Sequence, residues 1–143
     1  ITDRKKDIIV TAGGKNVAPQ PIEGELKLDK HVGEAVVIGD RRRYLVALLV
    51  PNFETLEATA RERGLDTDDR SGLIHHPEVQ KIYSDAVHAV NQRLASFEQI
   101  KTFRLIDHEF TQDDGQLTPS MKVKRKVIQE RYTDTIESMY EGS

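Results

Sequence analysis

Two dense aliphatic runs separated by a short polar turn constrain the fold of this chain more than any other feature. Residues 35–38 read Ala-Val-Val-Ile and residues 45–50 read Leu-Val-Ala-Leu-Leu-Val, with Gly39, Asp40 and three arginines in the turn region. Neither run alternates apolar with polar residues, so we expect two strands that are covered on both faces. The short turn favours an antiparallel hairpin. At 143 residues the chain is long enough for one domain and too short for two well-buried ones.

Helix start and stop signals lie on both sides of this hairpin. Pro19 and Pro21 stand where a first helix would begin, because proline fits the first helical turn. Asn52 is a suitable N-cap and Gly64 a suitable residue just past a helix end, which predicts a second helix over residues 53–63.

Further elements follow from periodicity. Pro77 opens a helix with apolar residues at three- and four-residue steps. These are Val79, Ile82, Tyr83, Ala86, Val90 and Leu94. The final helix is expected to carry one apolar stripe, made of Ile128, Tyr132, Ile136 and Tyr140. Residues 8–10 and 103–106 predict strands, and residues 66–72 and 113–115 predict a loop and a turn. The sum is an α+β domain in which helices flank a small mixed sheet.

Composition and charge exclude several classes of protein. The formal charge of −3 and the pI of about 6.0 argue against a general nucleic-acid binder. No apolar run approaches the ~18–20 residues that span a bilayer, and the absence of cysteine excludes disulfides and thiolate metal sites. The histidines, including adjacent His75 and His76, have no carboxylate at a familiar ligand spacing, so we expect no metal site. Because the chain opens at Ile1 rather than Met, we expect it to be part of a longer protein.

Two cation-bearing segments exceed what a structural domain needs. In the first, Gly13 and Gly14 permit a close approach of ligand to backbone, and Lys15 offers a point charge for a phosphate. In the second, Lys122 follows a polar Thr-Pro-Ser loop before the last helix. Taken singly, each is more economically explained as solvated surface, and the same holds for the three arginines at 41–43, which could also meet a phosphate.

Taken together and in this order, the two segments resemble those of the AMP-forming acyl-CoA synthetases, at their C-terminal domain. The opening is similar to the hinge motif of that superfamily, which also includes luciferases and peptide-synthetase adenylation domains. The matching elements are Asp3-Arg4, Lys6-Asp7, Ile8-Ile9-Val10, Gly13 and Pro19 through Glu23. Residues 117–125 resemble the catalytic-lysine motif, with Met121 in place of the usual glycine. That replacement, and residues 94–101, resemble the long-chain fatty acyl-CoA synthetase branch.

The resemblance implies a role for each matching residue. Lys122 would bridge the substrate carboxylate and the α-phosphate of ATP, where a mobile ammonium offsets the repulsion between two anions. Arg4 would contact the nucleotide ribose, and Lys6 would be the hinge residue about which the domain rotates between half-reactions. The loop of Gly13 and Gly14 would line the pantetheine channel of coenzyme A, with Lys15 near the nucleotide or coenzyme A phosphates.

The resemblance implies that this chain is the mobile lid domain of a larger enzyme, without the large domain that the lid covers. Residues 1–143 would form one lid domain, with a hinge segment over about residues 1–10. The resemblance assigns ATP, its Mg²⁺ and the fatty acid to a large N-terminal domain absent from this chain. Two alternatives stay open: the lid of a fatty acyl-AMP ligase that passes its adenylate to a carrier protein, or a stand-alone module that binds a phosphate ligand. We expect a cytoplasmic protein, and leave peripheral membrane association open.

Overall fold

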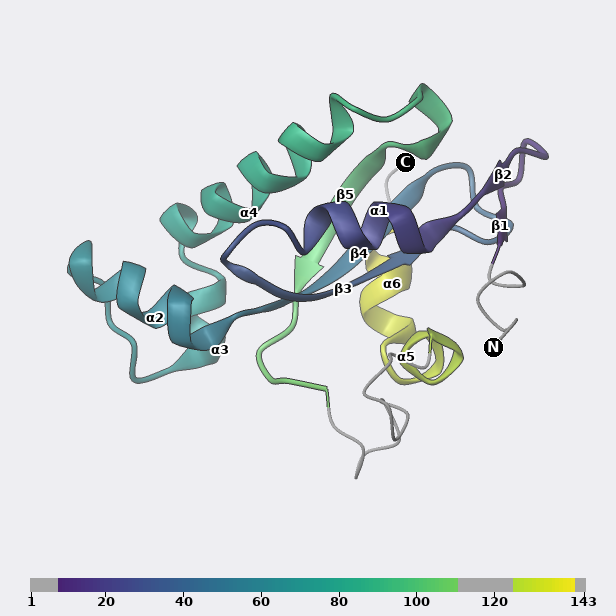
Figure 1. Cartoon of the computed structure of the whole chain (residues 1–143). Helices are drawn as coiled ribbons and strands as arrows, with labels where there is room; N and C mark the ends of the chain where they lie inside the picture. Colours follow the sequence, from purple (N-terminus) through teal and green to yellow (C-terminus); the bar gives the residue numbers. More distant parts are fainter. Residues whose placement is uncertain (1–7, 111–124, 141–143) are drawn as a thin grey trace.

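A mixed three-stranded sheet forms the centre of the computed structural model, which describes residues 8–110 and 125–140 (Figure 1). Strand β3 (Val32–Ile38) pairs antiparallel with β4 (Leu45–Pro51), as the two aliphatic runs predict. Strand β5 (Ile100–Leu105) lies on the other side of β4 and runs parallel to it. The prediction of an α+β domain with a small mixed sheet is therefore confirmed.

The middle strand, β4, is buried along its whole length. Successive side chains of a strand point to opposite faces, so burial of every residue requires cover on both sides of the sheet. In the view of Figure 1, helix α1 (Pro19–Leu26) lies in front of the sheet and α6 (Thr133–Tyr140) lies behind it. Helix α4 (Pro77–Asn91) packs against α1.

The proline-started helices form where the sequence predicts them. Pro19 and Pro77 each occupy the first helical turn, where the missing amide costs no hydrogen bond. Helix α1 buries Ile22 and Leu26 on one face, as their spacing predicts. Helix α4 ends before Leu94, which is partly buried against the core from the segment that follows.

Helix α2 (Phe53–Glu62) has the two end signals that the sequence predicts. The Asn52 side chain accepts a hydrogen bond from the amide of Thr55 at 3.3 Å. Gly64 follows with a φ of +75°, the left-handed conformation that closes a helix at little steric cost in glycine.

The loop predicted over residues 66–72 is wrong in its second half. Helix α3 (Arg70–Ile74) begins inside it, capped by the Asp69 side chain, which accepts from the amide of Ser71 at 3.1 Å. This short helix forms because the core binds its end: Leu73 and Ile74 are both buried.

Strand β5 begins three residues earlier than predicted. The Asn91 side chain accepts from the amide of Ile100 at 2.8 Å and donates to its carbonyl at 2.9 Å, which starts the strand at that residue. Ile106 lies just past the strand, although its amide still donates to the carbonyl of Leu49 at 2.9 Å.

The single final helix of the prediction is divided into two, α5 (Arg125–Arg131) and α6, with Tyr132 between them. The Thr133 hydroxyl donates to the carbonyls of Gln129 and Glu130, at 2.9 Å each, and such back-bonding bends helices. Ile128 and Ile136 are buried on either side of the division, so the predicted apolar stripe is kept across it.

Candidate functional site: the glycine hairpin and the base of the lysine segment

The structure describes three of the six residues to which the sequence assigns a role. Gly13, Gly14 and Lys15 lie between strands β1 (Ile9–Val10) and β2 (Asn16–Val17), which pair antiparallel. Arg4, Lys6 and Lys122 lie outside the described residues, as does the turn predicted at 113–115.

The connection between β1 and β2 is a tight hairpin, which we call the glycine hairpin (residues 9–17). Thr11 organises it: its amide donates to the Lys15 carbonyl at 2.9 Å, and its hydroxyl accepts from the Lys15 amide at 3.1 Å. Gly14 has a φ of +84°, a conformation that most side chains resist. A Cβ built on Gly13 or Gly14 would meet nothing within 4 Å, so packing inside this domain does not require either glycine. The tip of the hairpin is an open surface that backbone alone presents.

The glycine hairpin is fixed to the turn between β3 and β4, which we call the arginine turn (residues 39–43). The Arg41 amide donates to the Val10 carbonyl at 2.8 Å, and the Ala12 amide donates to the Arg42 carbonyl at 2.9 Å. The Asp40 carboxylate accepts from the Val10 amide at 3.3 Å. The glycine hairpin and the arginine turn are separate in the sequence, but these hydrogen bonds hold them together. They form one corner of the domain, at the right of Figure 1.

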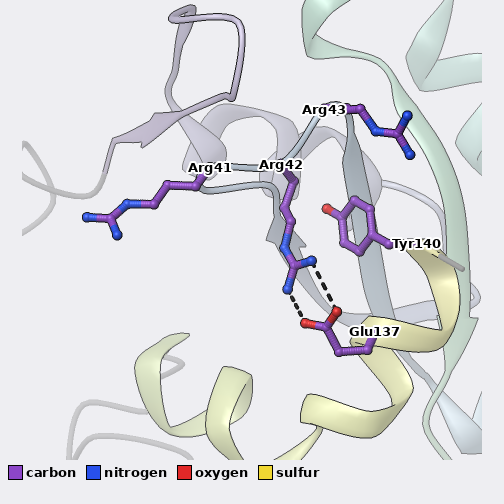
Figure 2. Close-up of a pocket in the computed structure, with 5 residues that line it drawn as sticks. All are labelled: Arg41, Arg42, Arg43, Glu137 and Tyr140. Carbon is purple, nitrogen blue, oxygen red and sulfur yellow. Dashed lines mark hydrogen bonds and ion pairs between the residues drawn. The ribbon is translucent and has the colours of Figure 1, made fainter.

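Arg42 links this corner to the C-terminal helix. Its guanidinium makes a two-pronged contact with the Glu137 carboxylate of α6 and lies 4.6 Å from the centroid of the Tyr140 ring (Figure 2). The hydrogen bond from Arg42 lowers the pKa of Glu137, and the same hydrogen bond raises the pKa of Arg42. Fork-to-carboxylate pairing of this kind fixes orientation as well as adding energy.

Tyr140 anchors the same corner from below. Its hydroxyl donates to the Tyr44 carbonyl at 2.9 Å, and the two rings stack with centroids 4.9 Å apart. The Tyr44 hydroxyl donates in turn to the Met139 carbonyl at 3.1 Å. Burial is the main reason that the pKa of the Tyr140 hydroxyl is raised, so this group stays a neutral donor.

The three arginines do not form one phosphate clamp. Arg41, Arg42, Arg43, Glu137 and Tyr140 line an open pocket of about 360 Å³. Figure 2 shows Arg41 and Arg43 pointing away from each other, while Arg42 is turned to Glu137. The prediction of three equivalent solvated arginines is thus wrong for Arg42, which is half-buried and has a structural role.

A third segment reaches the surface near the hairpin. The Lys15 ammonium lies 5.6 Å from the centroid of the Phe97 ring, and that ring is 40% exposed. Phe97 belongs to a short 3₁₀ helix (Ser96–Glu98) within the residues that resemble the long-chain branch. Phe97 thus presents its ring to the Lys15 ammonium rather than to the core.

A second cluster lies at the base of the segment that contains Lys122. The Nδ1 of His108 is 2.8 Å from the Asp107 carboxylate, and its Nε2 is 2.7 Å from the Tyr132 hydroxyl. The Tyr132 ring also lies 6.2 Å from that of Phe110, centroid to centroid. This cluster therefore places the chain that follows strand β5 against the junction between α5 and α6.

Comparison with known protein families identifies the family of this domain. Residues 6–143 match the family model described as the AMP-binding enzyme C-terminal domain. The chain belongs to this family. The resemblance found from the two cation-bearing segments is thereby confirmed.

Relatives of this AMP-binding enzyme C-terminal domain include long-chain-fatty-acid–CoA ligases. The chain is 40% identical over 141 residues to ligase FadD15 of Mycobacterium tuberculosis, covering 98% of this chain and 24% of that protein. It is 34% identical over 143 residues to human long-chain-fatty-acid–CoA ligase 1, covering 98% of this chain and 20% of the relative. The chain therefore spans about a quarter or less of the length of these relatives.

Solved structures agree with the fold. The adenylation domain of a carboxylate reductase from Mycobacterium chelonae superposes with a TM-score of 0.75 and 27% identity, over 96% of this chain and 20% of that one. The C-terminal domain described here is thus the same architecture as one part of a larger adenylating enzyme.

Two negative findings apply to the described residues of this AMP-binding enzyme C-terminal domain. Within residues 8–110 and 125–140, no helix combines the length and apolar character needed to span a bilayer. Within the same ranges, no three His, Asp or Glu side chains gather where they could share a metal ion.

Sequence reasoning missed the contacts that hold the site together. Arg42 and Glu137 are 95 residues apart, and nothing local in either segment marks them as partners. For the second cluster, the one local signal in the sequence was Thr133, next to Tyr132, where the last helix divides. Thr133 there is a residue type that bonds back to a helix carbonyl.

Proposed function

We propose that this domain is the lid of a long-chain-fatty-acid–CoA ligase. The whole enzyme would join a fatty-acid carboxylate to the α-phosphate of ATP, releasing pyrophosphate and leaving acyl-AMP. The thiol of coenzyme A would then attack the acyl-AMP carbonyl, giving acyl-CoA and releasing AMP. The 40% identity to a long-chain-fatty-acid–CoA ligase over nearly the whole chain supports this choice of substrates.

The observation that carries the proposal from the structure is the glycine hairpin. Its tip exposes backbone at Gly13 and Gly14, where no neighbour within this domain fills the space of a missing Cβ. A surface without side chains suits a narrow channel through which the pantetheine arm passes. The backbone bonds to the arginine turn hold this surface in place, so the lid can present it by rotating as a unit. Lys15, beside the tip, would meet phosphates of coenzyme A or of the nucleotide.

The adenylation step is assigned to Lys122. A carboxylate must approach a phosphate, and an ammonium placed between them would offset that repulsion and stabilise the transition state. Arg4 would contact the ribose, and Lys6 would be the pivot of the hinge segment, residues 1–10. Rotation about Lys6 would exchange Lys122 for the glycine hairpin between the two half-reactions.

The remaining components belong to the proposed whole enzyme. A large N-terminal domain would bind the fatty acid and ATP with its Mg²⁺, while residues 1–143 would form a single lid domain that binds none of these tightly by itself. We place the enzyme in the cytoplasm. We expect the isolated chain to fold and to form no acyl-CoA from fatty acid, ATP and coenzyme A.

A second candidate keeps the adenylation step and changes the acceptor. The solved relative at 27% identity is described as the adenylation domain of a carboxylate reductase rather than as a CoA ligase. In that case the lid would serve an enzyme that passes acyl-AMP to a carrier protein. Supplying coenzyme A as the only acceptor in a full-length assay distinguishes the two, because only the CoA ligase then converts acyl-AMP to acyl-CoA. A stand-alone phosphate-binding module, the third alternative, would bind CoA or phosphate without any partner domain.

The deciding experiment uses the full-length enzyme with Lys122→Ala and assays each half-reaction separately. Adenylation, followed by pyrophosphate exchange, should fall by roughly 10²–10³, as expected for one lost electrostatic stabiliser. Thioester formation from supplied acyl-AMP should persist, because Lys122 would have rotated away from the reacting atoms. Lys126→Ala, which removes an exposed cation from the nearby helix α5, is the matched control and should leave both steps unchanged.

Other outcomes would contradict parts of the proposal. A parallel loss of both half-reactions would mean that Lys122 is structural or that the lid does not alternate. No loss in either step would overturn the lysine assignment, and Lys124 would then be the next residue to test.

A further inference from the structure

Arg41 adopts a backbone conformation that arginine resists. The Arg42 amide donates to the Gly39 carbonyl at 2.9 Å, so Arg41 is the third residue of a β-turn. The φ of Arg41 is +63°, and a turn that needs a positive φ at this place ordinarily has glycine or asparagine there. Within the described part of the chain, the other residues with positive φ are glycines, Gly14 and Gly64. The turn would therefore be less strained with glycine in place of Arg41.

The Arg41 side chain has no partner that explains its place in the turn. It is exposed, and Figure 2 shows it directed away from Glu137 and Tyr140. Within residues 8–110 and 125–140, no hydrogen bond or ion pair involves its guanidinium. A strained residue with an unused charge indicates an interaction with something other than these residues. Other arginines of the domain do pair with carboxylates, namely Arg42, Arg61, Arg63, Arg70 and Arg93.

The position of Arg41 is fixed relative to the glycine hairpin. Its amide donates to the Val10 carbonyl at 2.8 Å, and the neighbouring Asp40 carboxylate accepts from the Val10 amide at 3.3 Å. Strand β1, which contains Val10, lies at the end of the proposed hinge segment, residues 1–10. Any surface that receives the glycine hairpin therefore also approaches Arg41.

The surface of β1 next to Arg41 is apolar. Ile8 and Val10 are 43% and 44% exposed, while Ile9 between them is buried. Exposed aliphatic side chains beside an arginine are typical of a protein interface, where a guanidinium pairs with a carboxylate. A phosphate, by contrast, is usually held by several converging donors, and Arg41 and Arg43 point away from each other. The geometry therefore favours a protein carboxylate as the partner of Arg41.

We propose that Arg41 docks the lid on the large N-terminal domain by pairing with a carboxylate of that domain in the thioester-forming pose. The partner surface would present an acidic side chain beside apolar ones, so that Ile8 and Val10 are covered as the ion pair forms. Because backbone hydrogen bonds join Arg41 to the glycine hairpin, the pair would also fix the hairpin at the channel. Arg41 touches neither acyl-AMP nor the thiol and is a positioning residue. The inference rests on the proposed function, since it assumes that the lid rotates to present the hairpin.

The first test separates stability from activity with Arg41→Gly and Arg41→Asn. Both new residues accept a positive φ, so the thermal midpoint of this chain should rise by roughly 1–4 °C in each variant. In the full-length enzyme, thioester formation from supplied acyl-AMP should fall by roughly 5- to 30-fold, as expected for an ion pair lost from a partly desolvated interface. Adenylation should be unchanged. A merely structural arginine would not give a more stable fold together with the loss of one half-reaction.

Two further variants test the role of charge. Arg41→Lys retains the positive charge and should bring thioester formation back to within about threefold of the unmodified rate. Arg61→Gln is the matched control, because it removes one exposed positive charge from α2, and it should leave both half-reactions unchanged. Raising the salt concentration from about 0.05 M to about 0.5 M should narrow the difference between the unmodified and Arg41→Asn enzymes, since salt screens the ion pair.

The choice of acceptor distinguishes a protein carboxylate from a phosphate of coenzyme A. Pantetheine has the reactive thiol of coenzyme A without its phosphates. If the partner is a carboxylate of the large domain, Arg41→Asn should slow thioester formation as much with pantetheine as with coenzyme A. A defect confined to coenzyme A would assign Arg41 to a coenzyme A phosphate and overturn the interdomain pair.

Other results would also overturn the inference. A lower thermal midpoint in both Arg41→Gly and Arg41→Asn would mean that the fold itself requires the arginine. Unchanged thioester formation in both variants, or an equal loss of both half-reactions, would exclude a role in one pose. If the unmodified full-length enzyme forms no acyl-CoA, the proposed function fails and this inference fails with it. If it forms acyl-CoA while Arg41→Asn has no effect, only the docking role fails.

Discussion

The glycine hairpin and the base of the Lys122 segment are held by different means. Two backbone hydrogen bonds, a two-pronged ion pair and a stacked tyrosine pair fix the hairpin corner, so its position is set several times over. At the base of the Lys122 segment, the described contacts include the buried Phe110 ring and the hydrogen bond between Tyr132 and His108. The difference indicates that the hairpin moves only with the domain as a whole, whereas the contact between residues 107–110 and Tyr132 can be loosened by a single change.

Of the substitutions considered, Tyr140→Ala should destabilise the hairpin corner most strongly. It removes the hydroxyl bond to the Tyr44 carbonyl, the stack on Tyr44 and the ring beneath Arg42. We expect the free energy of unfolding of the isolated chain to fall by about 2–3 kcal/mol, measured by urea denaturation. Hydrogen exchange should quicken at the Ala12 and Arg41 amides. Equal quickening at the Ile106 amide would contradict the view that the two regions are anchored separately.

Gly14→Val should have the next largest effect. A β-branched residue is strained at a φ of +84°, which should cost about 1–2 kcal/mol in the free energy of unfolding. In the full-length enzyme, thioester formation should fall more than adenylation, because the added side chain stands on the surface assigned to the pantetheine channel.

Gly13→Ala is the control for that variant. Its φ is not positive and a Cβ there meets nothing within 4 Å, so the free energy of unfolding should change by less than about 0.5 kcal/mol. A destabilisation equal to that of Gly14→Val would mean that crowding, rather than backbone strain, limits substitution at the tip.

The ion pair between Arg42 and Glu137 should make the hairpin corner weakly sensitive to acid. Because the folded state lowers the pKa of Glu137, the pair stabilises above the ordinary glutamate pKa of ~4.3 and loses its effect as the pH falls through the lower folded value. The stability difference between the unmodified chain and Glu137→Gln should therefore be full at neutral pH and vanish in acid. Urea midpoints over a pH series measure it, and a difference independent of pH would contradict the ion pair.

The smallest expected effect is the coupling free energy between the two regions, measured by a double-mutant cycle. Tyr44→Phe removes a hydroxyl at the hairpin corner, and Tyr132→Phe removes one at the base of the Lys122 segment. Each should cost about 1 kcal/mol, and the coupling between them should be below about 0.5 kcal/mol, since their hydroxyls bond to different residues, Met139 and His108. A larger coupling, measured by urea denaturation of the two single variants and the double variant, would show that α6 connects the regions energetically.

Much of the fold could be predicted because its signals are local. The strands of the central hairpin are visible in the sequence as aliphatic runs. Helix ends are marked by residues with suitable backbone preferences, namely Asn52, Gly64, Pro19 and Pro77. The strand before Gly13 and the open glycine pair were likewise recognised from a short run of residues, whereas the returning strand β2 was not predicted. Each of these features depends on neighbours within a few positions, which is the range over which a sequence pattern carries information.

The errors arose where distant groups decide the outcome. Helix α3 is too short to be stable alone and forms because Leu73 and Ile74 reach the core. Strand β5 starts where the Asn91 side chain pairs with Ile100. The exposed ring of Phe97 is explained by Lys15, a residue more than eighty positions earlier.

By itself, then, the sequence determined most of the element types, the central hairpin and the residues able to carry the proposed chemistry. Local conformational preference and motif order are sufficient for those conclusions. Only the tertiary structure decided that Arg42 belongs to Glu137 rather than to a phosphate, and that His108 meets Tyr132 across residues 111–124. Such contacts form because packing α6 behind the sheet brings together groups that no local pattern relates, and their energies depend on that proximity.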